Sequence, residues 1–437
     1  MEKSEKLTNK WLNPLAIGLY FAALKLFIHL LFNSNYGYFR DELYFIACGE
    51  HLAWGYPDHA PLVALMAKTN RFLFGDSLFA LRLFPALAGA FKVFLTAVLV
   101  KEFGGKSFSA FLACLCVFCA PIYLAVDNLF SMNSLEPIFW MLCVYFAVRA
   151  IKDSESENPT SSLNWIPFGI FAGLGLMNKH SMLFFGFSLV IGILLTKDRK
   201  VFLDKFFWLG GIIAFIIFLP NMIWQFQNDF ATLELLRNVQ TSGKNVEMSP
   251  LQFFLSQILG MLPTAFPVWL AGIWFFLADK NGKRFRFLGI CYLVLLALMI
   301  YLKAKDYYLA PIYPMLFAAG AVWIEQLSEK IRLLRFVRCV LPVLIFFPTI
   351  LVAPTLLPIL PIDKLVKYQE KIGLKPPKSE VANDSPVQQI FSDQLGWEEL
   401  TAKVADVYNS LPTEERTKAG IFAGNYGEAG AIDFYGA

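Results

Sequence analysis

The run Tyr36-Gly-Tyr-Phe-Arg-Asp-Glu-Leu-Tyr-Phe45 places Arg40 and two adjacent carboxylates, Asp41 and Glu42, directly after a long apolar segment. Carboxylates at such a place suit a general base for an incoming hydroxyl or amine, or a ligand of a divalent cation. In an apolar cavity, desolvation would raise the carboxyl pKa towards the range that a base needs. An acidic first turn that complements a helix dipole is the structural alternative, and the doublet alone leaves it open.

A second polar group follows at the bend Gly55-Tyr-Pro-Asp-His-Ala-Pro-Leu62. Asp58 and His59 are able to contact a phosphate, a sugar or an acceptor, and they are weak candidates for ligands of a divalent metal ion. A solvated turn between prolines explains the pair equally well. No cysteine spacing typical of a metal site accompanies it.

The elements that must position these residues are membrane helices. The chain has 437 residues, of which 57% are hydrophobic and 16% charged, and its mean hydropathy is +0.53. Because an average soluble domain has about 25% charged residues, this composition excludes an ordinary soluble fold. The net charge of +4, without a basic run among aromatics, gives no indication of a nucleic acid partner.

A hydrocarbon core about 30 Å thick needs roughly 20 apolar residues per helix, and about eleven such segments occur. They cover residues 14–32, 77–100, 107–126, 134–150, 165–177, 181–196, 206–224, 251–277, 287–302, 307–324 and 336–357. With the N-terminus inside, the inner loops contain more than twice as many Lys and Arg residues as the outer loops. We therefore predict an all-α polytopic protein of the bacterial inner membrane, with the doublet on the periplasmic side.

Three ionisable side chains, Lys25, His29 and Lys92, lie within predicted spans. An ionised residue there costs roughly 2.5 to 3.5 kcal/mol on insertion scales. We expect these side chains to face the bundle interior or a path for a lipid head group.

Two stretches are not predicted to span. Residues 33–76 form the first periplasmic loop, with the periodicity of two amphipathic helices separated by Pro57 and Pro61. Residues 358–437 are polar enough for a small soluble α/β domain on the periplasmic side, and residues 1–357 form the membrane domain. An apolar strand is expected at 419–423, and residues 425–427 would turn it into a following helix. Since the chain stops within this pattern, we expect a C-terminally truncated domain.

The order of these motifs resembles bacterial membrane glycosyltransferases of the dolichyl-phosphate-mannose protein mannosyltransferase type. These belong to the GT-C superfamily, together with the aminoarabinose transferase that modifies lipid A. The resemblance rests on the acidic doublet, the 55–62 bend and four later motifs. These read Ala80-Leu-Arg-Leu-Phe-Pro85, Gly173-Leu-Gly-Leu-Met-Asn-Lys-His180, Lys305-Asp-Tyr-Tyr-Leu-Ala-Pro-Ile-Tyr-Pro314 and Gly424-Asn-Tyr-Gly-Glu-Ala-Gly-Ala431.

The resemblance implies a GT-C fold and a transferase that uses a polyprenyl-phosphate-linked sugar, such as an undecaprenyl-phosphate sugar, in an inverting reaction. By carry-over, Asp41 would be the general base and Glu42 a supporting carboxylate. Cations must then stabilise the phosphate leaving group as the glycosidic bond breaks. The candidates for binding the donor phosphate are Lys179, which matches the family's lysine, and Arg82, Lys303, Lys305, Tyr308 and Arg40. A snorkelling side chain or an interfacial aromatic belt is the alternative for each.

The chain departs from the family at Ser131-Met-Asn-Ser-Leu-Glu-Pro137, where relatives often carry an Asp. Asn133 stands near that position and Glu136 follows, so both join Asp58 and His59 as candidates for sugar or acceptor binding. The resemblance does not fix the acceptor, which could be lipid A, a protein or a glycan, nor the use of a divalent metal. A transporter or flippase of lipid-linked saccharides is the competing function, and it predicts that Asp41 is dispensable.

Overall fold

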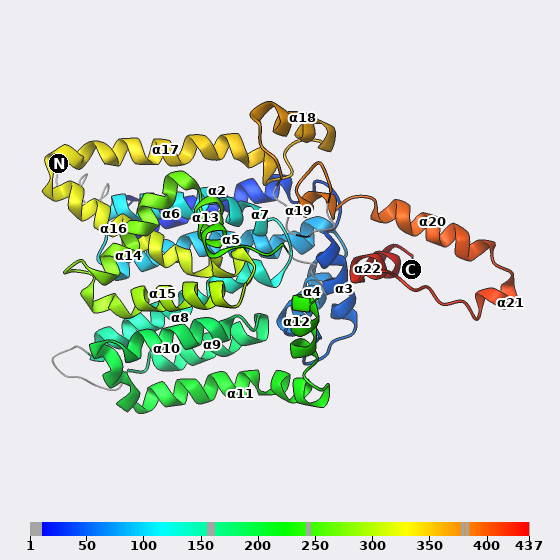
Figure 1. Ribbon diagram of the computed structural model, residues 1–437, viewed down its shortest axis with the longest axis horizontal. Helices are drawn as coiled ribbons and strands as arrows, with labels where there is room; N and C mark the ends of the chain where they lie inside the picture. The colour runs from blue at the N-terminus through cyan, green and yellow to red at the C-terminus, as the bar shows by residue number, and fades with distance from the viewer. Residues whose placement is uncertain (1–10, 155–161, 242–245, 377–379, 381–383, 437) are drawn as a thin grey trace.

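The computed structural model describes residues 11–154, 162–241, 246–376, 380 and 384–436. A bundle of long helices forms the body, and shorter helices gather at one end of it (Figure 1). Within the described residues there is no β-strand, and one isolated bridge residue occurs at Glu380. The predicted all-α class is therefore confirmed.

The bundle and its connections contain the following helices: α2 (Pro14–Phe32), α5 (Leu78–Glu102), α6 (Ser107–Cys119), α7 (Pro121–Val126), α8 (Met132–Ser154), α9 (Trp165–Asn178), α10 (Met182–Leu194), η1 (Lys197–Leu203), α11 (Lys205–Gln227), α13 (Pro250–Gly260), η2 (Pro263–Ala265), α14 (Phe266–Leu277), η3 (Lys283–Phe285), α15 (Arg286–Tyr301), η4 (Asp306–Ile312), α16 (Tyr313–Lys330), η5 (Arg332–Phe336), α17 (Val337–Val352) and η6 (Ala353–Thr355). Helix α2 packs along α5, α9 along α11, α14 along α16 and α10 along α15.

Every predicted apolar segment coincides with one or more of these helices. Among the described residues, seven helices are long and apolar enough to cross a membrane, and the bent pair α13–α14 makes an eighth if it counts as one. Helices α6, α9 and α10 are shorter apolar helices. The chain is thus a multi-pass membrane protein.

The predicted segment 251–277 is not one straight helix. Its two halves, Pro250–Gly260 and Pro263–Leu277, meet at an angle of 92°. Leu262 has a φ of 70°, a left-handed conformation, and it precedes Pro263, whose ring disfavours the α region for the residue before it. The left-handed Leu262 and the following Pro263 interrupt the helix at this point. The hydropathy of the segment does not reveal this bend, because both halves are apolar.

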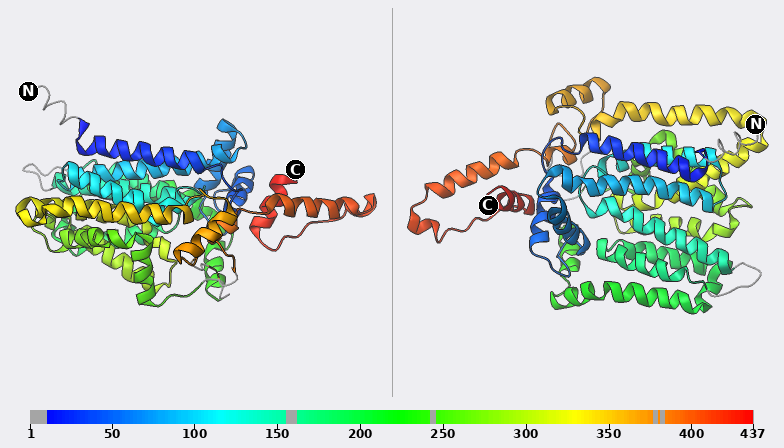
Figure 2. Two further views of the ribbon diagram at one scale, coloured as in Figure 1. Left: turned by 90° about the horizontal axis from the view of Figure 1, so that it is seen from above. Right: turned by 180° about the vertical axis from the view of Figure 1, so that it is seen from behind.

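The remaining helices lie at one end of the bundle, opposite the start of α2 (Figure 2). They are α3 (Arg40–Glu50), α4 (Leu62–Phe74), α12 (Ala231–Thr241), α18 (Ile362–Ile372), α19 (Gln389–Ser392), α20 (Trp397–Ser410), α21 (Thr413–Arg416) and α22 (Tyr426–Tyr435). The two helices predicted for the first loop are present as α3 and α4. The first loop and the C-terminal segment share one end, as the predicted topology requires; Lys3, Lys6 and Lys10, which entered that prediction, lie outside the described residues.

The strand predicted at 419–423 is wrong. These residues have no regular secondary structure and Phe422 is 98% exposed, so this stretch lacks a neighbouring strand to satisfy its backbone. The turn into a helix is confirmed, because the Asn425 side chain accepts hydrogen bonds from the amides of Gly427 and Glu428 at the start of α22. Helices α20 and α21 project from the bundle, whereas α22 returns to pack on α3 (Figures 1 and 2).

The charged residues within the spans face the bundle interior. Lys25 and Lys92 both pair with Asp127, at 3.1 and 2.7 Å, and all three side chains are fully buried. His29 is buried close to them. The Lys92 ammonium also lies 3.9 Å from the centre of the Tyr123 ring, on α7. This cluster therefore fixes α7, which carries pocket residues described below, against α2 and α5.

Because Gly89 has no side chain, the Asp127 carboxylate can pack directly against the backbone of α5 at this residue. A Cβ atom at position 89 would lie 2.6 Å from Asp127 Oδ2. We expect Gly89→Ala to destabilise the protein by about 1–3 kcal/mol, as overpacking does elsewhere, and to lower its midpoint of thermal unfolding in detergent. Gly211→Ala is the matched control, because nothing lies within 4 Å of the added Cβ atom. Equal midpoints for the two variants would contradict the packing argument.

Candidate active site

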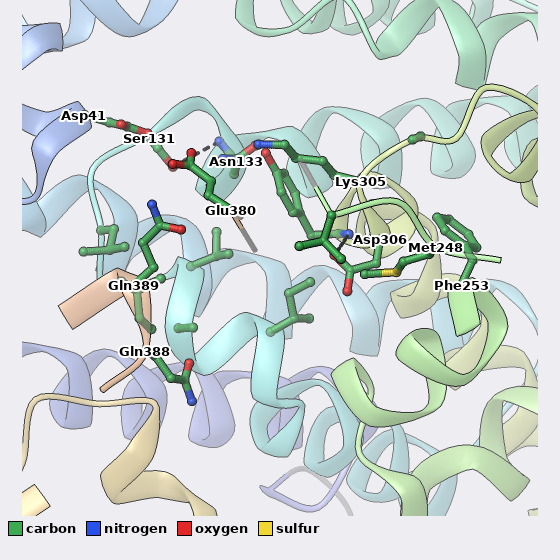
Figure 3. A pocket seen from close by; sticks show the side chains of 18 of the residues that line it. Asp41, Ser131, Asn133, Met248, Phe253, Lys305, Asp306, Glu380, Gln388 and Gln389 are labelled. Carbon is green, nitrogen blue, oxygen red and sulfur yellow. Dashed lines mark hydrogen bonds between the residues drawn. The ribbon is translucent and has the colours of Figure 1, made fainter. Parts of the chain in front are cut away.

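A pocket of about 410 Å³ lies at the end of the bundle where α3 is found (Figure 3). Its residues come from the start of α3, the α7–α8 region, the chain before and within α13, η4 and the C-terminal segment. The apolar ones include Ile122, Val126, Met248, Phe253 and Ile300, and the polar ones include Asp41, Asn133, Lys303, Lys305 and Gln389. Such a lining suits a ligand with both a hydrocarbon part and a charged part.

Asp41 reaches this pocket from the first turn of α3. Its Oδ1 accepts a hydrogen bond of 2.8 Å from the Tyr426 hydroxyl and lies 3.5 Å from Arg40 Nε. Burial raises the pKa of the Asp41 carboxyl, and Arg40 and Tyr426 oppose that rise. A carboxyl with a raised pKa at the edge of a pocket is suited to accept a proton from a bound substrate.

Glu42 points away from the pocket, although it is the next residue. Both of its oxygens bind the Arg82 guanidinium, at 2.9 and 2.8 Å, and both side chains are fully buried. Glu42 also accepts hydrogen bonds from the amides of Phe39 and Phe130. Arg82 donates to the carbonyls of three loop residues, Asn33, Asn35 and Gly37.

Neither Glu42 nor Arg82 lines the pocket, so the supporting role predicted for Glu42 and the phosphate contact predicted for Arg82 gain no support from its geometry. Successive residues of a helix point about 100° apart, and here Asp41 lines the pocket whereas the Glu42 side chain is turned towards Arg82 on α5. Instead, the bidentate Glu42–Arg82 pair ties α3 and the first loop to α5. The pair thereby fixes the backbone next to Asp41.

Arg40 lines the pocket, but its charge is already balanced. Its guanidinium lies 3.3 Å from Asp393 and 3.4 Å from Glu380, both in the C-terminal segment. It also lies 5.3 Å from the centre of the Tyr426 ring. Phosphate binding by Arg40 would have to compete with these partners.

Lys179 is brought together with three other predicted residues. Its Nζ donates to Asn133 Oδ1 at 2.9 Å and to Glu136 Oε2 at 2.8 Å, and it lies 4.2 Å from the centre of the Tyr308 ring. Asn133 lines the pocket, as does Tyr307, whose ring centre is 5.3 Å from the same ammonium. Lys179 therefore lies directly behind the pocket lining.

Lys303 and Lys305 both line the pocket, with different surroundings. Lys303 is exposed and pairs with Glu247 at 2.7 Å. Among the described residues the Lys305 ammonium has no ion-pair or hydrogen-bond partner, although the Lys305 carbonyl accepts a hydrogen bond from the Tyr308 amide. In Figure 3 its side chain extends towards the side on which Asp41, Ser131 and Asn133 lie. Lys305 is thus a pocket cation available to an anionic ligand.

Asp58 and His59 do not line the pocket. Asp58 accepts a hydrogen bond of 2.8 Å from the Tyr44 hydroxyl, and His59 Nδ1 lies 2.8 Å from the carbonyl oxygen of Ala60. Burial lowers the pKa of His59, which favours the neutral ring. Among the described residues no three His, Cys, Asp or Glu side chains form a group that could hold a metal ion. Asp58 and His59 therefore give the metal hypothesis no support.

The C-terminal segment supplies residues that the motif analysis missed. Glu380 and Gln389 line the pocket, Asp393 pairs with Arg40, and Tyr426 donates to Asp41. The motif 424–431 contains Tyr426, but it predicts a turn and a family resemblance without indicating a contact with Asp41. No local pattern shows that a residue 385 positions after Asp41 contacts it.

Comparison with known proteins agrees with this architecture. Residues 58–224 match the sequence profile of the dolichyl-phosphate-mannose-protein mannosyltransferase family. No curated protein sequence matches the chain significantly.

Three solved structures share the fold. ArnT from Cupriavidus metallidurans bound to undecaprenyl phosphate has a TM-score of 0.62 and 13% identity, over 96% of this chain and 84% of that one. Its apo state has a TM-score of 0.60 and 14% identity, over 95% and 84% of the two chains. The Archaeoglobus fulgidus oligosaccharyltransferase in complex with Zn and sulfate has a TM-score of 0.56 and 12% identity, over 96% of this chain and 61% of that one.

The chain therefore spans less than two thirds of the oligosaccharyltransferase and most of ArnT. The protein has the fold of ArnT and of the archaeal oligosaccharyltransferase, and its residues 58–224 match the family of dolichyl-phosphate-mannose-protein mannosyltransferases.

Proposed function

We propose that the protein transfers a sugar from a polyprenyl-phosphate donor, such as an undecaprenyl-phosphate sugar, to an envelope acceptor at the periplasmic face of a bacterial inner membrane. The observation that carries this proposal is the pocket, which combines Asp41, Lys305 and apolar side chains. The ArnT structure bound to undecaprenyl phosphate supports the class of donor. The acceptor is a lipid, a protein or a glycan with a free hydroxyl or amine.

In this mechanism Asp41 takes the proton of the acceptor hydroxyl or amine as that group attacks the anomeric carbon of the donor sugar. The bond from this carbon to the phosphate oxygen breaks, and the polyprenyl phosphate leaves with the electron pair. The raised pKa of Asp41 supports this role, because a more basic carboxylate accepts a proton more readily. Asp58 and His59 approach Asp41 from the 55–62 bend, and we keep them as candidates for acceptor contacts.

Two lysines are suited to stabilise the phosphate that leaves. Negative charge grows on its oxygen as the glycosidic bond breaks, and preorganised cations lower the energy of that state. Lys305 faces the pocket directly, and Lys179 lies behind Asn133 and Tyr307. The apolar residues near α13 and α15 would receive the first isoprene units.

The test is turnover by the purified protein in liposomes with a panel of radiolabelled undecaprenyl-phosphate sugars and membrane extract as acceptor. Transfer of label with release of undecaprenyl phosphate supports the proposal and identifies the sugar. Movement of labelled lipid across the bilayer without any transfer would contradict it and favour the flippase.

We expect Lys305→Met to weaken binding of undecaprenyl phosphate about 10- to 100-fold, because a charge-assisted hydrogen bond contributes about 1.5–3 kcal/mol. Equilibrium binding of the labelled lipid in detergent measures this. Lys303→Met is the matched control: it also removes a pocket lysine, but one already paired with Glu247, so its effect is expected to stay below about threefold. Unchanged binding in both variants would contradict a phosphate site in this pocket.

A further inference from the structure

We propose that helix α22, near the end of the chain, is a positioning element of the active site, in which the Tyr426 hydroxyl holds the carboxylate of Asp41. This inference rests on the proposed function, because it assigns a role to Tyr426 in the transfer that Asp41 would catalyse. It assigns the C-terminal segment a role in orienting Asp41, which the sequence motifs alone do not indicate.

The docking of α22 on α3 is built from small residues. A Cβ atom on Gly427 would lie 2.3 Å from Arg40 Cγ, and one on Gly430 would lie 3.1 Å from the backbone of Leu43 and Tyr44. Ala431, one residue further, is fully buried. Since residues three and four apart share one helix face, these three positions form a surface with no side chain larger than a methyl group, which lets the two backbones approach.

This approach places Tyr426 directly over the start of α3. Its hydroxyl donates to Asp41 Oδ1 at 2.8 Å, and its ring centre lies 5.0 Å from that of Tyr44 and 5.3 Å from the Arg40 guanidinium carbon. Because Tyr426 binds one carboxylate oxygen, the rotation of the Asp41 side chain is restricted. The second oxygen, Oδ2, stays available to accept the proton of an acceptor.

The same segment also controls the charge next to Asp41. Asp393 and Glu380 share Arg40 with Asp41, because the same guanidinium lies 3.3 Å from Asp393, 3.4 Å from Glu380 and 3.5 Å from Asp41. The hydrogen bond from Tyr426 lowers the pKa of Asp41, in opposition to burial. The titratable groups that face Asp41 are Arg40 on α3, Asp58 and His59 in the 55–62 bend, Tyr307 on η4, Asp393 near α19 and Tyr426 on α22. Of these, Tyr426 donates a hydrogen bond to the carboxylate and can lose its hydroxyl without loss of its ring.

The test compares Tyr426→Phe with Tyr435→Phe in the full chain, using the liposome assay over a range of pH. Both variants remove one hydroxyl from α22, but Tyr435 contacts Tyr38 through its ring and has no contact with Asp41. We expect Tyr426→Phe to lower kcat about tenfold, to leave the KM for the donor unchanged and to move the acidic limb of the pH profile to higher pH. Tyr435→Phe is expected to keep the wild-type profile.

The direction of the pH shift follows from the loss of the hydrogen bond. Without it the pKa of Asp41 rises, so a higher pH is needed to ionise the base. A purely structural role would lower the amount of active protein at every pH and leave the limb in place. In an Asp41→Asn background, Tyr426→Phe is expected to have no further effect on the remaining turnover.

The outcomes separate the inference from the proposed function. Turnover in the wild type with identical pH profiles in Tyr426→Phe and the wild type would overturn the role of Tyr426 and leave the transferase proposal intact. A wild-type protein that turns over no donor at any pH would overturn both. A shift in Tyr435→Phe as large as that in Tyr426→Phe would show that the hydroxyl on Asp41 is not the cause.

Discussion

Replacement of Asp41 by asparagine is expected to reduce sugar transfer by about 10³-fold while the protein still binds undecaprenyl phosphate. General bases typically contribute about 10²- to 10⁴-fold to the rate, and asparagine retains the shape of the side chain without its basicity. The Tyr426 hydroxyl can still donate to the amide oxygen of asparagine, so α22 is expected to stay docked. Turnover in liposomes and equilibrium binding of the labelled lipid measure the two quantities separately.

Asp433→Asn is the control for this experiment. Asp433 lies on α22 as an exposed carboxylate away from the pocket, so the same change of charge there is expected to leave turnover unchanged. If Asp41→Asn also kept full turnover, the assignment of the base would be wrong. If labelled lipid crossed the bilayer equally in both variants without transfer, the flippase hypothesis would replace the transferase.

The bundle was largely predictable from the sequence, because the thickness of the bilayer fixes the length and polarity of each helix independently of its neighbours. The bend at Leu262 was not apparent in the hydropathy, since both of its arms are apolar. The run 419–423 looked like a strand because it is short and apolar. A strand, however, needs a partner for its backbone, and local composition cannot supply that information.

The site was predictable only in part. The motifs led to Asp41, to the pocket lysine Lys305 and to the cluster of Lys179 with Asn133 and Glu136. They assigned Asp41 as the base and Glu42 as a supporting carboxylate, but they did not show that Glu42 is buried against Arg82 and lies outside the pocket lining. The contact of Tyr426 with Asp41 required the path of the whole chain.

Arg82→Met is expected to destabilise the protein by about 3–5 kcal/mol, because it leaves the buried Glu42 charge without its partner. The carbonyl oxygens of Asn33, Asn35 and Gly37 lose a donor as well. The midpoint of thermal unfolding in detergent measures this loss. Arg71→Met is the matched control, since Arg71 pairs with Glu50 and Asp76 at the exposed surface, where such pairs contribute at most about 1 kcal/mol.

A second variant separates this positioning role from the phosphate contact that the motif suggested for Arg82. In Arg82→Met/Glu42→Gln the buried negative charge is gone, while the glutamine oxygen can still accept the hydrogen bond from the Phe130 amide. The double variant should therefore unfold at a higher temperature than Arg82→Met alone, although it lacks the same arginine. If Arg82→Met instead unfolded like the wild type and bound undecaprenyl phosphate much more weakly, Arg82 would contact the donor directly. The ion pair with Glu42 would then not be what holds Asp41 at the pocket.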